Sequence, residues 1–384
     1  MKVHYISPST LPSRTANSVH VVWQSHGLVQ AGAEVTLYAK RSIEDASALP
    51  AALEAAYGID ATGLSLTTFF SRSTRASNLR IAGVAVRHLR QGGRDSLIIS
   101  RNLYASFILG VIGRRPLVFE THQLERGVRK ALQRALVTRP WIATVLVSRQ
   151  LEEHLARHLG VKPRRPIVLH DAAPDGIVPL DPMQRRQARQ AMAPESAGNW
   201  KLVCGYFGHL YEGRGIEILR AIAAAQPDML FLVYGGNDAD VEVHRAETSL
   251  PNLRFMGHVA YPQAQRLMTA MDALLMPYQR SVSIGVRGHD TASWMSPMKM
   301  FEYLATGVPI VASALPSLSE VLSHGRNCLL VAPDDSRAWV AALEQLASDP
   351  ALAGRLGQQA HLDYRQRHTW TRRAEALLEA ARSV

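Results

Sequence analysis

The chain of 384 residues is poor in cysteine and has no long apolar run. Its two cysteines, Cys204 and Cys328, lie in apolar, strand-like segments, which predicts reduced core residues of a cytosolic protein rather than a disulfide or metal site. No stretch approaches the roughly 18 apolar residues that a membrane span requires, and residues 1–18 hold no run suited to a signal peptide. We therefore expect a cytoplasmic protein without a transmembrane segment.

Glycine is absent from the loop at residues 7–20, which follows the first predicted strand. A dinucleotide-dependent oxidoreductase is expected to carry a Gly-x-Gly there, so the absence disfavours that class of enzyme. Ser13, Thr15 and Asn17 lie in this loop where a helix is expected to begin. We predict that these side chains face an acceptor substrate.

Acidic residues are scarce only in the first half. Up to Asp175 there are 23 Lys and Arg against 12 Asp and Glu, and the later residues are balanced, so the whole net charge of +11 lies before the midpoint. Basic residues recur at helical spacing in two rows. The first row holds Arg80, Arg87, Arg90 and Arg94. The second holds Arg126, Lys130 and Arg134, and Val128 lies on the opposite face of that predicted helix. Such helices can contact an anionic membrane, although a solvated basic face explains them equally well. We expect no nucleic-acid binding, since no aromatic residues interleave with the arginines.

Short β-branched runs alternate with helix-period stretches, which predicts an α/β fold of two doubly wound, Rossmann-like domains facing across a cleft. We expect an N-terminal, acceptor-side domain over residues 1–175 and a linker with one short helix over 176–200. A nucleotide-sugar-binding domain is expected over 201–365, and a C-terminal helix over 366–384 that crosses back to the first domain. His170 and Asp171 are expected to serve the hinge. Ligands of such sheets bind at the carboxyl ends of the strands.

The strongest motif is SPMKMFEYLATGVPIVAS at residues 296–313. Ser296 is predicted to cap a helix that has Pro297 at its first position, Met298 on its buried side and Gly307 at its end. Free amides at the helix start suit a phosphate, and Lys299 in the first turn adds a charge. Glu302 lies on the same face, where it could bind a sugar hydroxyl. The alternative is an ordinary helix with Lys299 and Glu302 on its wet face.

A glycine-rich turn, GYFGHLYEGRGIEIL, follows the first strand of the second half. Gly208, Gly213 and Gly215 permit close approach to a diphosphate, and Arg214 can neutralise its charge. We expect this turn to lie at the same sheet end as the helix after Ser296. Two anion-suited turns in one domain together predict a nucleotide-diphosphate site.

These segments resemble family 4 retaining glycosyltransferases, and the SPxKxFEY form of residues 296–303 resembles the bacterial envelope-polysaccharide type. Further similar segments occur in the family's order: residues 16–24, 32–39, 119–122, 147–155, 233–242, 252–259 and 271–279. The resemblance covers nearly the whole chain. It implies a GT-B fold and transfer of a sugar from a nucleotide-diphosphate donor with retention of configuration and without a metal.

The resemblance also implies residue roles. Glu302 is expected to bind the nucleotide ribose, Arg214 to stabilise the leaving diphosphate, and Lys299 to face the phosphates. Gly208 would let the phosphates approach, and His122 would lie near the donor sugar.

The chain departs from the family pattern at two positions. Trp294 replaces the first glutamate of the family's pair, and His209 stands where many relatives place an arginine. Asp290 is the candidate replacement for the missing sugar contact. Val259 marks the segment expected to contact the base, and Glu120 is predicted on the acceptor side.

The predicted function is therefore transfer of a sugar to a saccharide or lipid-linked acceptor in envelope polysaccharide or glycoconjugate synthesis, at the inner face of the cytoplasmic membrane. We expect no cofactor beyond the nucleotide sugar and no metal, because Asp238 and Asp240 spell a DxD where a helix cap is the simpler interpretation. A GT-B nucleotide-sugar epimerase and a non-catalytic GT-B subunit remain as alternatives.

Overall fold

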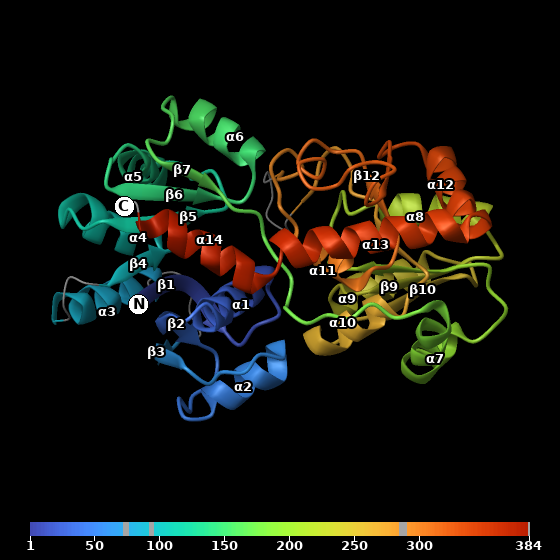
Figure 1. The fold of residues 1–384 in the computed structure, drawn as a ribbon, viewed down its shortest axis with the longest axis horizontal. Helices are drawn as coiled ribbons and strands as arrows, with labels where there is room; N and C mark the ends of the chain where they lie inside the picture. The colour runs from blue at the N-terminus through green and yellow to red at the C-terminus, as the bar shows by residue number, and fades with distance from the viewer. Residues whose placement is uncertain (72–76, 92–95, 284–289, 383–384) are drawn as a thin grey trace. The chain divides into compact units, whose positions relative to one another are not determined.

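The computed structural model describes residues 1–71, 77–91, 96–283 and 290–382. The chain forms two compact units (Figure 1). Unit 1 comprises Met1–Asp171 and Thr369–Val384, and unit 2 comprises Ala172–His368. The chain thus passes from unit 1 to unit 2 after Asp171 and returns after His368, whereas the sequence suggested a linker from residue 176 and a crossing helix from 366.

Unit 1 contains a seven-stranded sheet in the order β3-β2-β1-β4-β5-β6-β7. Every pair of neighbouring strands is parallel. Parallel strands need crossover connections, and the helices between them provide these. The strands are β1 (Lys2–Leu11), β2 (Glu34–Arg41), β3 (Leu64–Phe70), β4 (Leu97–Ser100), β5 (Leu117–Thr121), β6 (Ile142–Leu146) and β7 (Pro166–Val168).

The helices of unit 1 include one that arrives from the far end of the sequence. The C-terminal helix α14 packs beside α1, the first helix (Figure 1). Gly27 permits this approach, because a Cβ there would lie 2.8 Å from the backbone carbonyl carbon of Trp370. The helices are α1 (Ala16–Gln30), α2 (Leu49–Tyr57), α3 (Ser77–Gln91), α4 (Leu103–Ser106), the π-helix η1 (Phe107–Ile112), α5 (Val128–Val137), α6 (Arg149–Leu159) and α14 (Trp370–Arg382).

Unit 2 contains a six-stranded parallel sheet in the order β10-β9-β8-β11-β12-β13. Its strands are β8 (Val203–Phe207), β9 (Leu230–Tyr234), β10 (Leu253–Gly257), β11 (Ala273–Met276), β12 (Ile310–Ser313) and β13 (Leu329–Val331). Its helices are α7 (Pro182–Met192), the 3-10 helix η2 (Pro194–Ser196), α8 (Ile216–Ala225), α9 (Asp238–Ala246), α10 (Tyr261–Thr269), α11 (Met298–Thr306), α12 (Ser336–Ser348) and α13 (Pro350–Arg367). The prediction of two Rossmann-like domains is confirmed.

Two local predictions about the helix after Ser296 are corrected. Pro297, not Ser296, is the N-cap of α11, and no side chain caps the helix. A proline nitrogen carries no hydrogen, so the cap position fits it, and the helix amides begin one residue later than expected. Gly307 ends the helix in the left-handed conformation with φ of 65°, as predicted.

The basic helices of unit 1 are only partly as expected. Ala82 and Ala85 of α3 are buried while Arg80 and Arg87 are exposed, but the side chain of Arg90 and all of Arg94 lie outside the described residues. Val128, predicted to pack opposite the basic row of α5, is 80% exposed, because it stands at the first position of that helix, before the packed turns. Among the helices that the structure describes, none combines the length and apolar composition needed to cross a bilayer.

Candidate functional site

The glycine-rich turn between β8 and α8 is packed tightly against the chain that follows β11. Gly213 and Gly215 have φ values of 79° and 85°, and a Cβ at either would overlap a backbone carbonyl oxygen, of Ser281 and Pro277 respectively. Both glycines are therefore required by the turn itself, whatever it binds. Gly208 is different: its φ is 152°, and a Cβ there would overlap the ammonium group of Lys299. The turn and α11 are thus brought together, as the two motifs predicted.

Lys299 places a cation in a buried position at the start of α11. Its Nζ lies 4.1 Å from the ring centroid of Tyr206 and 5.1 Å from that of Tyr278. This Nζ is buried and makes no hydrogen bond within the described residues. Burial, followed by the charge of Arg214, holds the pKa of Lys299 well below its usual value, although Glu302 opposes the shift. The alternative of a Lys299 ammonium on the wet face of the helix is therefore wrong.

Arg214 lies beside the same tyrosines. Its guanidinium carbon is 5.0 Å from the ring centroid of Tyr278, and its Nη2 donates to the carbonyl oxygen of Ser283 at 3.2 Å. Its Nε is buried and has no hydrogen-bond partner in the described parts of the chain. Buried donors without acceptors are costly, so Arg214 and Lys299 together form a site that an anion rich in acceptor oxygens would satisfy.

His209 extends this cationic cluster. It is exposed, and its ring stacks on Tyr211 with centroids 4.7 Å apart. Partial burial and then the charges of Arg214 and Lys299 lower the pKa of His209. The imidazole is therefore a weaker cation than an arginine at this position would be, and Arg214 and Lys299 supply the charge.

Glu302 is 5% exposed, so the alternative of a carboxylate on the wet face of the helix is also wrong for it. Its Oε1 accepts a hydrogen bond from the Tyr261 hydroxyl at 2.6 Å. Burial, and after it the negative charge of Glu302, raises the pKa of Tyr261 well above its ordinary value. The phenol of Tyr261 therefore keeps its proton and donates it to the hydrogen bond. Sequence reasoning missed Tyr261. Its only sequence signal was its position, two residues after Val259, at the start of a helix.

The other residues predicted on the donor side also lie in unit 2. Ser296 is buried, and Pro297 and Met298 are half-buried at the start of α11. Val259 is half-buried just after β10 and packs against the core. Asp290 is exposed, and its Oδ1 accepts hydrogen bonds from the backbone amides of Val282 and Ala292, both at 2.9 Å. Oδ1 of Asp290 is therefore already engaged by backbone amides, and the role of Asp290 as a sugar contact stays a prediction.

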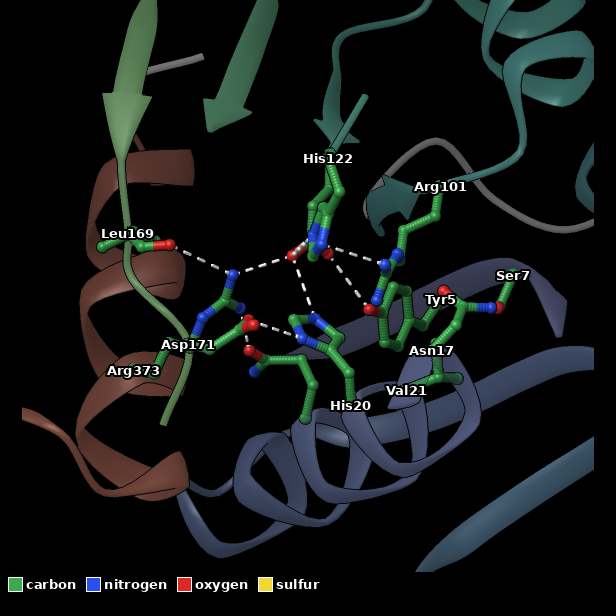
Figure 2. A network of polar contacts seen from close by, with 12 residues as sticks. Tyr5, Ser7, Asn17, His20, Val21, Arg101, His122, Leu169, Asp171 and Arg373 are labelled. Carbon is green, nitrogen blue, oxygen red and sulfur yellow. Dashed lines mark hydrogen bonds and ion pairs between the residues drawn. The ribbon is translucent and has the colours of Figure 1, made fainter. Parts of the chain in front are cut away.

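A second polar centre lies in unit 1, around Glu120 at the end of β5 (Figure 2). Glu120 Oε1 accepts from Arg373 Nη2 at 2.7 Å and from the Nε2 atoms of His20 and His122, each at 3.1 Å. Its Oε2 accepts from the Tyr5 hydroxyl at 3.0 Å. Asp171 contacts His20 and belongs to the same group. We call this group of residues the Glu120 network: Tyr5, His20, Glu120, His122, Asp171 and Arg373.

The prediction that Glu120 faces an acceptor is corrected by this arrangement. Glu120 is 2% exposed, and both of its oxygens are occupied. Burial alone would raise the pKa of Glu120, but Arg373, His20 and Arg101 outweigh it and hold the pKa well below the usual range. Glu120 is therefore an ionised carboxylate that organises its neighbours rather than one that contacts a substrate.

His122 is held at the rim of the Glu120 network, and its side chain is 25% exposed. Its Nδ1 lies 3.2 Å from Arg101 Nη2 (Figure 2). Arg101 Nη1 is buried and has no hydrogen-bond partner among the residues described. Sequence reasoning missed Arg101, His20 and Arg373, since they come from three segments that only the fold brings together.

Ser13, Thr15 and Asn17 gather at the end of β1 as predicted for a helix start. Thr15 is the N-cap of α1, and its side chain accepts from the amide of Ser18. Ser13 Oγ lies 3.0 Å from Thr15 Oγ1, and Asn17 Nδ2 donates to Ser9 Oγ at 2.6 Å. These contacts account for the polar side chains as a cap, and their acceptor role stays a prediction.

The ligand atoms of His20, Glu120 and His122 all lie within 4.8 Å of one another, close enough to hold a metal ion. The guanidinium of Arg373 is already 2.7 Å from the same carboxylate oxygen. A divalent cation there would meet a fixed positive charge, and the set is therefore poorly suited to a metal. In unit 2 the DxD motif lies in the first turn of α9, which is capped by Asn237 rather than by Asp238.

Residues 201–349 match the protein-family model described as glycosyl transferases group 1. The match lies within unit 2 and includes Gly208, Arg214, Lys299 and Glu302. The glycosyltransferase TuaH of teichuronic acid biosynthesis from Bacillus subtilis is 29% identical over 125 residues, which are 32% of this chain and 30% of TuaH. The first curated relatives are covered to about half of their length or less.

Several solved structures match nearly the whole chain. Anabaena Alr3699/HepE in complex with UDP has a TM-score of 0.73 at 19% identity, with 100% of both chains covered. WaaG, a glycosyltransferase involved in lipopolysaccharide biosynthesis, has a TM-score of 0.66 at 14% identity, with 97% of this chain and 98% of that chain covered. The chain has the GT-B fold. At these identities the likeness establishes the architecture of the chain and not its substrates.

Proposed function

We propose that the chain is a glycosyltransferase that moves a sugar from a nucleotide-diphosphate donor to an acceptor hydroxyl. The buried Lys299 ammonium carries the proposal, since it has no hydrogen-bond acceptor among the described residues and lies against Gly208. A diphosphate would supply that acceptor. The match of residues 201–349 to glycosyl transferases group 1 supports the same function.

The proposed chemistry is stabilisation of the leaving group. Negative charge develops on the diphosphate as the glycosidic bond breaks, and cations preorganised in a buried site oppose it most effectively. Lys299, Arg214 and the first amides of α11 have this role, and Glu302 binds the ribose. The acceptor hydroxyl attacks from the face that the diphosphate leaves, passing its proton to the phosphate, so that configuration is retained without a metal or another cofactor.

The proposed donor is a uridine diphosphate sugar, because the structures similar to this chain include complexes with UDP and UDP-glucose. The proposed acceptor is a saccharide or lipid-linked saccharide in envelope polysaccharide synthesis, because TuaH belongs to teichuronic acid biosynthesis and WaaG to lipopolysaccharide biosynthesis. We further propose that the reaction takes place at the inner face of the cytoplasmic membrane, where the exposed Arg80 and Arg87 of unit 1 contact anionic lipid. Flotation with anionic but not neutral vesicles, abolished by high salt, tests that contact, and equal flotation with both would contradict it.

A panel of nucleotide sugars tests the activity. Release of nucleoside diphosphate that rises when an acceptor extract is added is the expected result. Interconversion of sugars without release would indicate an epimerase, and nucleotide binding without either reaction would indicate a non-catalytic subunit. The anomeric configuration of an isolated product decides whether the reaction retains or inverts.

A further inference from the structure

The hydrogen bonds of the Glu120 network determine where the protons of its two histidines lie. Burial would raise the pKa values of both Glu120 and Asp171, yet both pKa values are lowered. Arg373 is the main cause for Glu120, and His20 is the main cause for Asp171. Both carboxylates are therefore ionised and only accept hydrogen bonds. His20 lies between them, with Nδ1 2.8 Å from Asp171 and Nε2 3.1 Å from Glu120. Each nitrogen of His20 must therefore donate, and His20 is an imidazolium.

The hydrogen-bond partners of His122 require a neutral ring, in contrast to the imidazolium of His20. Its Nε2 faces the Glu120 carboxylate, so Nε2 carries a hydrogen. Its Nδ1 faces Arg101, which can only donate, so Nδ1 carries a lone pair. Burial and then Arg101 lower the pKa of His122 to about 4, which agrees with a neutral ring. The network thus assigns His122 as the neutral tautomer protonated on Nε2.

Arg373 is the cation that balances Glu120, and it belongs to the helix that returns from unit 2. Its Nη1 contacts Gln24, its Nε donates to the carbonyl of His170 at 2.8 Å, and its Nη2 donates to Glu120 at 2.7 Å. The side chain is 2% exposed. All three guanidinium nitrogens are thus engaged, and the side chain has one fixed position (Figure 2).

We propose that Arg373 is a positioning residue that acts through Glu120 to keep His122 neutral, protonated on Nε2 and fixed beside Arg101. The C-terminal helix is then part of the reaction apparatus and not only a packing element. This inference rests on the proposed function and on the expectation from the family resemblance that His122 lies near the donor sugar. Without Arg373, the charge of Glu120 is shared among fewer donors, so it holds a proton on His122 more strongly. The groups facing His122 are Arg101, Glu120 and His20, with Tyr5, Asp171 and Arg373 behind them.

The test compares Arg373→Met and Arg373→Lys with Arg372→Met as a matched control. Arg372 lies on the same helix, is exposed and pairs with Glu375. Nitrogen-15 NMR of the full chain labelled at its 15 histidines reads the His122 titration, with His122→Gln assigning the resonance. In the methionine variant we expect the His122 pKa to rise by about one unit or more. We expect kcat to fall about tenfold with the donor KM within about threefold.

The lysine variant keeps the cation, so a wild-type His122 titration and near wild-type kcat are expected, and the control should match wild type. A folded methionine variant with an unchanged His122 titration would overturn the proposal. If the methionine variant does not fold, the lysine variant decides. A shifted His122 titration together with a wild-type kcat would show that turnover does not depend on the protonation state of His122, and it would overturn the proposal. The titration needs no substrate, so absence of any nucleotide-sugar reaction would defeat the proposed function while leaving this arm of the test intact.

Discussion

At the scale of single residues, the proposed donor site consists of charges kept from water. Lys299 and Arg214 lie over the rings of Tyr206 and Tyr278, which offer the cations only weak acceptors. Glu302 is buried nearby and is paired with a tyrosine hydroxyl. A site arranged in this way binds an anion strongly only because the free protein leaves its donors incompletely satisfied.

Lys299 makes nucleotide binding dependent on pH. Its pKa is low in the free protein, and a bound diphosphate stabilises the ammonium, so binding raises that pKa and takes up a proton. As pH rises between the free and bound pKa values, affinity should fall by up to about tenfold per pH unit. Calorimetry in buffers of different ionisation enthalpy measures the proton uptake. Lys299→Met should remove it, and zero uptake by the wild-type protein at every pH at which it stays folded would contradict the assignment.

Tyr261 should set the affinity for the nucleoside part of the donor. Tyr261→Phe removes the hydroxyl that orients Glu302 and leaves a buried carboxylate without that donor, at a cost of about 1–3 kcal/mol. We expect UDP to bind about tenfold more weakly, while inorganic pyrophosphate, which has no ribose, binds as before. Fluorescence or calorimetric titration compares the two ligands. Equal losses for both would show that the substitution damages the site as a whole.

At the scale of elements, α11 is fixed from behind by α13. A Cβ at Gly357 in α13 would overlap the carbonyl oxygen of Gly307, the residue that ends α11. The two helices therefore approach as closely as their backbones allow. This contact holds the end of the helix whose start presents Lys299.

Gly357→Ala should lower the free energy of unfolding by about 1–3 kcal/mol, because the new methyl group has no space. Gly354 in the same helix provides the matched control, since a Cβ there meets nothing within 4 Å. Gly354→Ala should raise stability by roughly 0.5–1 kcal/mol through helix propensity alone. Urea unfolding of both variants gives the comparison. A neutral Gly357→Ala would contradict the close approach of the helices.

The elements were predictable to very different degrees. The alternation of strands and helices was predictable, because buried parallel strands are continuous apolar runs bounded by turns. The N-cap of α11 was not predictable from the sequence. Ser296 and Pro297 are both acceptable before a helix, and tertiary packing decides between them. Val128 was assigned to a buried face by periodicity, but periodicity does not tell where a helix leaves its packing surface.

At the scale of the whole chain, unit 1 depends on residues from both ends of the sequence. Trp370 is fully buried against α1 in unit 1, and Arg373 completes the Glu120 network. The sequence suggested that the last helix crosses back, but it could not indicate that Arg373 pairs with a carboxylate more than half the chain away. Gly208, Arg214, Lys299 and Glu302, by contrast, were accessible because each lies in a compact local motif.

Removal of α14 by a stop after His368 should therefore unfold unit 1 selectively. The truncation exposes the face of α1 around Gly27 and leaves Glu120 without its arginine, and an unpaired buried charge costs about 3–5 kcal/mol. Hydrogen exchange should lose protection in β1, β5 and α1 while β8, β9 and β11 keep it. Retained protection in β5 would contradict the role given to α14.

Binding of a nucleoside diphosphate tests the central claim most directly. UDP titrated into the wild-type protein should bind, and Lys299→Met should weaken binding by about thirtyfold or more, since a buried charge-assisted contact to phosphate is lost. Lys201→Met is the control, because Lys201 lies in the same unit and pairs only with Glu344 among the described residues. Its affinity should equal that of wild type. Absence of binding to any nucleoside diphosphate, or equal affinity of Lys299→Met and wild type, would contradict the donor site.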